Sequence, residues 1–208
     1  RVACPPLLGL DRYGAGDWRC AEHFDWAMKR IVEENIGTVI VVARWGVVLP
    51  PASYGNERVA DLRYARDGHE IPRDRLAAEV EAGLRATFDG LAGRRVVVLF
   101  SIPEIGFDVP MVLAASARFG WTPPAAPDRA AYEARQKRAR ALFAAAGVAR
   151  PGVEILEPAD LLCGSGRCRI VDDGRLVYSD DDHLSLAGAA LVAPLFEPAL
   201  RRAAAEVR

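Results

Sequence analysis

The chain of 208 residues is long enough for one domain with a single substantial hydrophobic core. Its composition, 51% hydrophobic and 26% charged, is ordinary for a globular protein, and a formal net charge of −1 lacks the basic excess of nucleic-acid binders. No run of about 18 apolar residues occurs, so the sequence predicts no transmembrane span.

The four cysteines fall into two local pairs, Cys4 with Cys20 and Cys163 with Cys168. Four cysteines allow three connectivities, and locality favours these two pairs. Two disulfides would indicate an oxidising compartment. Free buried thiols and a zinc site are the alternatives, although zinc ligands usually stand closer together than the first pair, with further ligands to complete the shell. We predict neither a metal nor a cofactor.

Helical and strand-like patterns alternate along the chain, which predicts an α/β fold with a largely parallel sheet. Apolar residues at helical spacing predict helices over 21–36 and 73–91. Two apolar runs rich in β-branched residues, 38–44 and 94–101, predict strands buried on both faces. Residues 50–72 are rich in Pro, Gly and charge, and predict a long loop.

The second half of the chain alternates in the same way. Its predicted elements are a short helix near 110–117, a helix from Asp128 to about Ala146, a strand over 153–156, a hairpin of 169–171 with 175–178, and a last helix capped by Ser185. Sites in parallel sheets lie beyond the carboxyl ends of the strands. The loops after Arg44, Ser101 and Tyr178 are therefore predicted to meet at one edge.

The segment YSDDDHLSLAGA, from Tyr178 to Ala189, holds the sharpest chemical pattern. A catalytic His needs an acid on Nδ1 to set its tautomer, and Asp180 stands three residues before His183 in a predicted turn. Asp181 and Asp182 are predicted to be solvated or to lie near the helix N-terminus. The alternatives are a turn of capping aspartates beside a surface His, and a metal site formed by Asp180, Asp182 and His183.

Asp-x-x-His followed by Leu-Ser and Gly-Ala resembles the C-terminal block of the SGNH (GDSL-type) hydrolases. It most resembles the SGNH domains fused to the C-terminus of bacterial acyltransferase-3 membrane proteins, which modify surface polysaccharides. Three further stretches are similar to those domains, namely ACPPL (3–7), VVARW (41–45) and SIPEIGFDVP (101–110). Residues 162–189 match almost in full, so the resemblance spans essentially the whole chain.

The resemblance implies a three-layer α/β/α sandwich with a Ser-His-Asp triad, in which His183 is the general base and Asp180 orients it. The nucleophile belongs to a Gly-Asp-Ser block at the end of the first strand. The nearest string here, Gly16-Asp17-Trp18, has Trp in place of Ser. We therefore expect residues 1–208 to be a single domain that begins after this block. Because the family's first strand lies inside the sheet, we expect a gap or re-paired strands, poor stability and no activity from the chain alone.

Other site positions are less well defined. Arg44 and Trp45 stand where the family commonly has an oxyanion-hole Asn, so Arg44 is predicted either to contact an oxyanion or acidic sugar, or to form a structural ion pair with Trp45 packed over the strand end. Ser101 is a replacement nucleophile or a turn cap. Glu104 lines the site or caps a helix. The cationic run 135–140 is predicted to be the solvated face of a helix.

These features predict an O-acyltransferase or esterase domain that acts on a cell-envelope polysaccharide through a serine acyl-enzyme. Its expected partners are a membrane acyltransferase domain of the same polypeptide, which delivers the acyl group, and a glycan acceptor, with no nucleic acid. Its expected place is the periplasmic face of the inner membrane. The alternatives are a non-catalytic domain that binds a glycan or a protein, and a metal-dependent hydrolase.

Overall fold

The computed structural model describes residues 4–13, 17–55 and 62–206. The chain folds into two compact units, which are described one at a time. Unit 1 comprises Arg1–Ala52, Val59–Phe100 and Gln136–Ile155, and unit 2 comprises Ser53–Arg58, Ser101–Arg135 and Leu156–Arg208.

A parallel sheet forms the centre of unit 1, with the strand order β3 (Thr38–Val42), β6 (Arg95–Leu99), β7 (Val153–Leu156). β3 and β6 are parallel over five residue pairs, from Thr38 opposite Arg95 to Val42 opposite Leu99. The predicted α/β class is therefore confirmed. Of the two arrangements expected for the sheet, a gap or re-paired strands, the structure has no gap between β3 and β6, which pair directly with each other.

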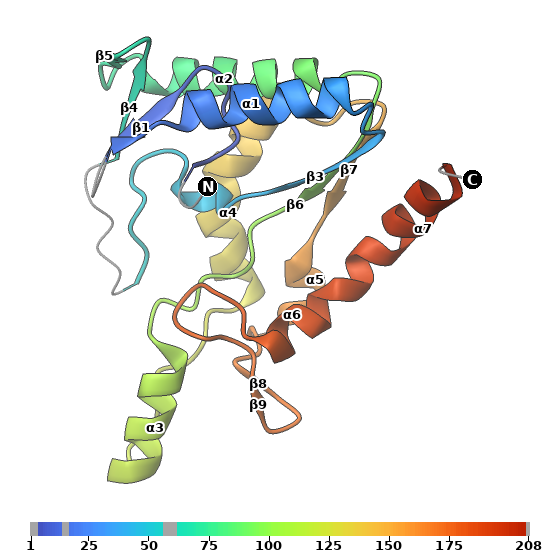
Figure 1. Cartoon of the computed structure of the whole chain (residues 1–208). Coiled ribbons are helices and arrows are strands. Elements are labelled where there is room, and N and C mark those ends of the chain that lie inside the picture. Colours follow the sequence, from blue (N-terminus) through green and yellow to red (C-terminus); the bar gives the residue numbers. More distant parts are fainter. Residues whose placement is uncertain (1–3, 14–16, 56–61, 207–208) are drawn as a thin grey trace. The chain divides into compact units, whose positions relative to one another are not determined.

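Helices α1 (Cys20–Glu33) and α2 (Leu76–Gly90) lie on the same side of this sheet (Figure 1). The apolar face predicted for α2 is buried. So are the side chains of β6 from Val96 onward, which confirms that this strand is covered on both faces. The same prediction is wrong for β3, where Ile40 and Val42 are 43% and 59% exposed. β3 lies at an edge of the three strands, and alternate residues share its open face.

Unit 1 contains a second sheet that the sequence did not predict. Its strands are β1 (Asp11–Tyr13), β2 (Asp17–Trp18), β4 (Arg63–Arg66) and β5 (His69–Glu70), all antiparallel in the order β2-β1-β4-β5. The interpretation of residues 50–72 as one long loop is therefore wrong. Asp67 and Gly68, both with positive φ, form the turn between β4 and β5. Buried Tyr64 holds β4 in place by donating its hydroxyl hydrogen to Val48 O, 3.1 Å away.

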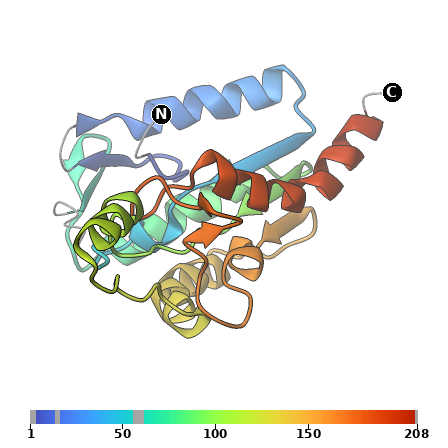
Figure 2. The ribbon, with the colours of Figure 1, turned by 90° about the horizontal axis from the view of Figure 1, so that it is seen from below.

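Unit 2 is mostly helical. Its elements are α3 (Val109–Phe119), α5 (Pro158–Leu162), the hairpin β8 (Val171–Asp172) and β9 (Arg175–Leu176), α6 (Leu186–Val192), a 3₁₀ turn (Ala193–Phe196) and α7 (Glu197–Glu206). The predicted hairpin turn is confirmed, since Asp173 and Gly174 both have positive φ. α6 packs beside the hairpin and α5 (Figure 2).

Helix α4 (Arg129–Ala145) begins in unit 2 and ends in unit 1. Its predicted cap is confirmed, because Asp128 Oδ1 accepts the Ala131 N–H at 2.8 Å. Disulfides join Cys4 to Cys20 in unit 1 and Cys163 to Cys168 in unit 2, as the local spacing predicts. Within the described residues, no helix has both the length and the apolarity required to cross a bilayer.

Candidate active site

The acidic loop, defined here as residues 179–184, connects the hairpin β8-β9 to helix α6 in unit 2. Its ends are tied together, because Ser179 N donates to His183 O at 2.8 Å and Tyr178 forms a β-bridge with Leu184. Helix α6 starts immediately after the loop, with Ser185 Oγ accepting the Gly188 N–H at 3.1 Å, so the predicted cap is confirmed. A short closed loop followed by a capped helix gives the side chains on the loop a defined position.

Asp180 organises this loop with both of its carboxylate oxygens. Oδ1 accepts backbone hydrogen bonds from Asp182 N at 2.9 Å and His183 N at 2.7 Å, while Oδ2 lies 2.8 Å from His183 Nδ1. Partial burial raises the pKa of Asp180, but the two backbone N–H groups and the His183 ring outweigh it and hold that pKa below the ordinary value. Asp180 is therefore an ionised hydrogen-bond acceptor on the imidazole.

Asp182 also approaches the His183 ring. Its Oδ1 lies 2.7 Å from the same Nδ1, and its side chain is only 7% exposed. The prediction that Asp182 is solvated is therefore wrong. The tight loop is the physical reason, because it directs the side chains of residues 182 and 183 toward each other, which regular structure would not do.

His183 presents an accessible ring above these two carboxylates, with its side chain 74% exposed. Because both acids are at Nδ1, Nε2 is the ring nitrogen left for chemistry. Among the described residues, Asp180, Asp182 and His183 also form a group whose ligand atoms lie within 4.8 Å of one another. The two carboxylate–Nδ1 distances have hydrogen-bond length, shorter than the roughly 3.3 Å that separates two ligands bound to one zinc ion at about 2.0 Å. The arrangement fits an acid–imidazole pair better than a metal centre.

The loop that follows Ser101 is hydrogen-bonded to the acidic loop. Ile105 N donates to Asp181 O at 2.7 Å, and Val109 N donates to Asp180 O at 3.2 Å. Two of the three loops that were predicted to meet therefore do so, those after Ser101 and Tyr178. The loop after Arg44 belongs to unit 1, and its place at this edge stays a prediction.

Glu104, in this supporting loop, forms an ion pair with Arg135 at the start of α4. Asp108, not Glu104, caps α3, since its Oδ1 accepts the Met111 N–H at 2.8 Å. The prediction that Glu104 caps a helix is wrong, because its carboxylate is buried and pairs with the Arg135 guanidinium. The prediction of a solvated face for 135–140 also fails at two arginines: Arg135 is largely buried, and the Arg140 guanidinium lies 4.5 Å from the Phe100 ring centre.

The serine hydroxyls of the acidic loop and its helix cap are already engaged. Ser179 Oγ donates to His183 O at 3.2 Å, and Ser185 Oγ donates to Leu176 O at 2.5 Å while capping α6. Ser101 is 2% exposed, and its carbonyl accepts the Tyr132 hydroxyl hydrogen at 3.0 Å. Burial makes Ser101 a poor replacement nucleophile. The Gly16 position of the nearest Gly-Asp string lies outside the described residues.

Arg44 and Trp45 lie in unit 1, directly after β3. Trp45 is 2% exposed, its Nε1–H donates to Leu99 O at 3.0 Å, and its ring meets Phe143 edge to face. Trp45 is therefore packed over the strand end, as one of the two alternatives predicted, and this packing uses the one N–H that the indole could offer to an oxyanion. Arg44 is half-buried at the start of the 3₁₀ turn Trp45–Val47, and its contact with substrate stays a prediction.

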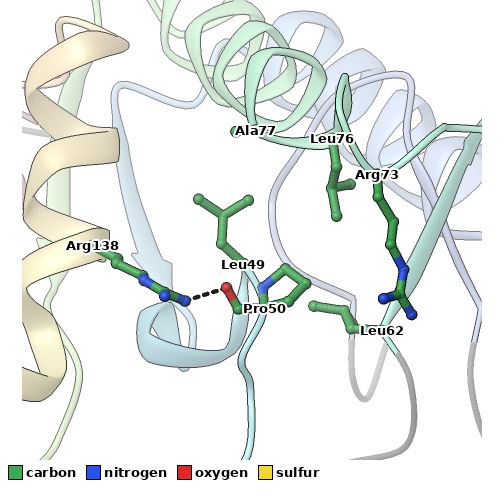
Figure 3. A pocket seen from close by; sticks show the side chains of 7 residues that line it. All are labelled: Leu49, Pro50, Leu62, Arg73, Leu76, Ala77 and Arg138. Atoms are coloured by element: carbon green, nitrogen blue, oxygen red, sulfur yellow. Dashed lines mark hydrogen bonds between the residues drawn. The ribbon is translucent and has the colours of Figure 1, made fainter.

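A cavity of about 360 Å³ lies in unit 1, and its lining residues do not include those of the acidic loop. Figure 3 shows Leu49, Leu62 and Leu76 around this cavity, with Arg73 and Arg138 on either side. Arg138 donates to Pro50 O. This cavity could not be predicted from the sequence, because its lining comes from four separated segments.

The comparisons with known proteins give the family and the fold. A family model described as "SGNH domain (fused to AT3 domains)" matches residues 1–198. The comparison with curated proteins gave no match. The periplasmic domain of a lipopolysaccharide acetyltransferase from Salmonella ser. Paratyphi A has a similar structure, with a TM-score of 0.59, 15% identity, and coverage of 95% of this chain and 69% of that one. At this identity the likeness shows a shared fold. Because the family model spans nearly the whole chain, this protein belongs to the family of SGNH domains fused to AT3 domains.

Proposed function

We propose that this domain transfers acyl groups to hydroxyls of a cell-envelope polysaccharide, and that hydrolysis is the same chemistry with water as the acceptor. The observation that carries the proposal is the 2.8 Å hydrogen bond between Asp180 Oδ2 and His183 Nδ1, in an accessible loop immediately before a capped helix. An ionised acid on Nδ1 keeps the proton there and leaves Nε2 as a base, which is the arrangement of a Ser-His-Asp triad.

The reaction runs in two steps. His183 Nε2 takes the proton of a serine hydroxyl as the serine oxygen attacks the acyl carbonyl, and the imidazolium then returns that proton to the departing group. In the second step a sugar hydroxyl loses its proton to Nε2 and attacks the acyl-enzyme, and the released serine oxygen recovers the proton. Asp180 balances the positive charge on the imidazolium in both steps.

The serine in this proposal comes from the Gly-Asp-Ser block that the family resemblance places ahead of Arg1. Arg44 is the proposed contact for the oxyanion or for an acidic sugar. Residues 1–208 form one SGNH domain of a longer polypeptide, whose membrane portion delivers the acyl group. The two disulfides support a periplasmic location, since such bonds persist in oxidising compartments.

The decisive test substitutes His183 in the full-length polypeptide. His183→Gln should lower the O-acyl content of the surface polysaccharide, measured by NMR of the purified glycan, and should lower the rate of p-nitrophenyl acetate cleavage by about 10²–10⁴-fold, the usual contribution of a general base. His69→Gln is the matched control, because His69 lies exposed on β5 in unit 1.

Equal activity of the His183→Gln and His69→Gln proteins would sink the proposal. The remaining interpretation would then be a non-catalytic domain that binds a glycan or a protein. Loss of activity in both variants would instead indicate a general folding defect, which circular dichroism of the two proteins detects.

A further inference from the structure

We infer that Asp182 is a second positioning carboxylate for His183 and shares its Nδ1 with Asp180. The inference deepens the proposed function, because it assigns a residue to the same site that the Asp-x-x-His spacing does not identify. Asp182 acts through His183 and is not itself in contact with the reacting atoms.

The geometry places two carboxyl groups at one nitrogen. Asp182 Oδ1 lies 2.7 Å from His183 Nδ1, and Asp180 Oδ2 lies 2.8 Å from it. Both contacts favour the tautomer with the proton on Nδ1, and both favour the positive imidazolium that forms when Nε2 accepts a proton. Neither carboxylate occupies Nε2.

The two acids differ in their other contacts and in their burial. Oδ1 of Asp180 accepts two backbone N–H groups and so builds the loop, which leaves Oδ2 alone to face the ring. Asp182 is the more buried of the two, with its side chain 7% exposed against 38% for Asp180. A contact in a less solvated position is screened less by water, so the contact of Asp182 with the ring is the less screened of the two.

Orientation is the second consequence. The terminal torsion of a His side chain has a broad energy profile, and a ring that is 74% exposed has few neighbours to hold it. With one hydrogen bond, the ring can still rotate about that bond. A second attraction at the same nitrogen, from a carboxylate on the neighbouring residue, narrows the range of this rotation and keeps Nε2 directed to one position.

The test measures the ring directly. We would record the ¹⁵N resonances of the His183 imidazole in the full-length polypeptide, identified by their loss in His183→Gln, for the unsubstituted protein, for Asp182→Asn and for Asp181→Asn. Asp181→Asn removes the same charge one residue away, at a half-exposed position whose backbone carbonyl, and not its side chain, is used by Ile105 N. We expect Asp182→Asn to lower the fraction of the Nδ1–H tautomer at least twofold relative to the other form, and Asp181→Asn to leave it unchanged.

The inference is overturned if Asp182→Asn leaves the tautomer ratio and ring mobility as they are in the unsubstituted protein, or if Asp181→Asn changes them equally. Should Asp182→Asn fail to fold, Asp182→Glu replaces it. This variant keeps the charge but moves it by one methylene, and it must alter the ratio in the same direction. Because the signal does not require turnover, a changed tautomer ratio in a full-length polypeptide that shows no acyl transfer would retain the inference and reject the proposed function.

Discussion

Glu104 and Arg135 form a two-pronged ion pair inside unit 2. Arg135 Nε lies 2.5 Å from Oε2 of Glu104 and Nη2 lies 3.1 Å from Oε1, while the two side chains are 2% and 11% exposed. The guanidinium carbon of Arg135 also lies 5.2 Å from the centre of the Tyr54 ring. Since Ile105 N holds the carbonyl of Asp181, this ion pair anchors the loop on which the acidic loop rests.

Arg135→Met should destabilise the protein by about 3–5 kcal/mol, because it leaves the buried carboxylate of Glu104 without a cation. Urea denaturation gives the free energy of unfolding for comparison. Arg129→Met is the matched control on the same helix: Arg129 is 28% exposed and pairs with the more exposed Glu133 and Asp160, so its loss should cost no more than about 1 kcal/mol. Equal losses of stability in the two variants would show that the buried Glu104–Arg135 pair stabilises the fold no more than the exposed pairs of Arg129 do.

Hydrophobic periodicity was sufficient to predict the longer elements. The apolar residues of α2 recur over several helical turns, and those of β6 form a continuous run. In both elements the residues predicted to be buried are buried. The sheet β2-β1-β4-β5 was missed because its strands have two to four residues, too few for a period to appear. Its one readable signal was the Asp67-Gly68 turn, which lay inside a segment that was otherwise loop-like.

The site was predictable only where a local motif defines it. Asp180 and His183 are three residues apart in a predicted turn, a spacing that suggested the pair, and the resemblance to the C-terminal block of SGNH hydrolases favoured it over a capping turn or a metal site. The contact of Asp182 with the ring depends on the backbone angles of the loop, which sequence does not reveal. The partner of Glu104 lies 31 residues away in sequence, and such pairings come from tertiary packing.

Gly188→Ala should destabilise unit 2 by about 1–3 kcal/mol, the usual range for forcing atoms into a packed site. A Cβ at position 188 would lie 2.0 Å from Val177 O, the same carbonyl that accepts the Ser185 N–H at the start of α6. Gly166→Ala is the control, because a Cβ there meets nothing within 4 Å and should change stability by less than about 0.5 kcal/mol. Thermal unfolding of both variants compares them, and a Gly188→Ala protein as stable as the control would contradict the close approach.

Gln136→Met should raise the free energy of unfolding by about 1–3 kcal/mol, since an unsatisfied buried polar group carries a cost of that size. Gln136 is fully buried in α4, and within the described structure neither its Oε1 nor its Nε2 has a hydrogen-bond partner. Met has a similar shape and no such groups.

Thr87→Val provides the opposite case for the same measurement. Thr87 is also buried, but its hydroxyl donates to Pro6 O at 2.9 Å and accepts the Leu8 N–H at 3.1 Å. Removing this satisfied hydroxyl should destabilise the protein by about 1 kcal/mol or more. If urea denaturation shows that Gln136→Met destabilises the protein as Thr87→Val does, the assignment of Gln136 as unsatisfied is wrong.

Asp180→Asn should reduce stability near neutral pH and lose its effect in acid. The folded pKa of Asp180 lies below its ordinary value, near 3.9 in the unfolded chain, so the ionised carboxylate stabilises the fold fully above about pH 5. That contribution is lost as pH falls through the lowered folded pKa. Because the side chain is 38% exposed, solvent screening should limit the effect to no more than about 1 kcal/mol.

Urea denaturation of both proteins between pH 7 and pH 2 isolates the contribution of Asp180 as the difference between their free energies of unfolding, since every other titratable group is common to both. A difference that grows toward acid would mean that Asp180 is protonated more easily in the folded state than in the unfolded chain, and its role as an ionised partner of His183 would fall with it.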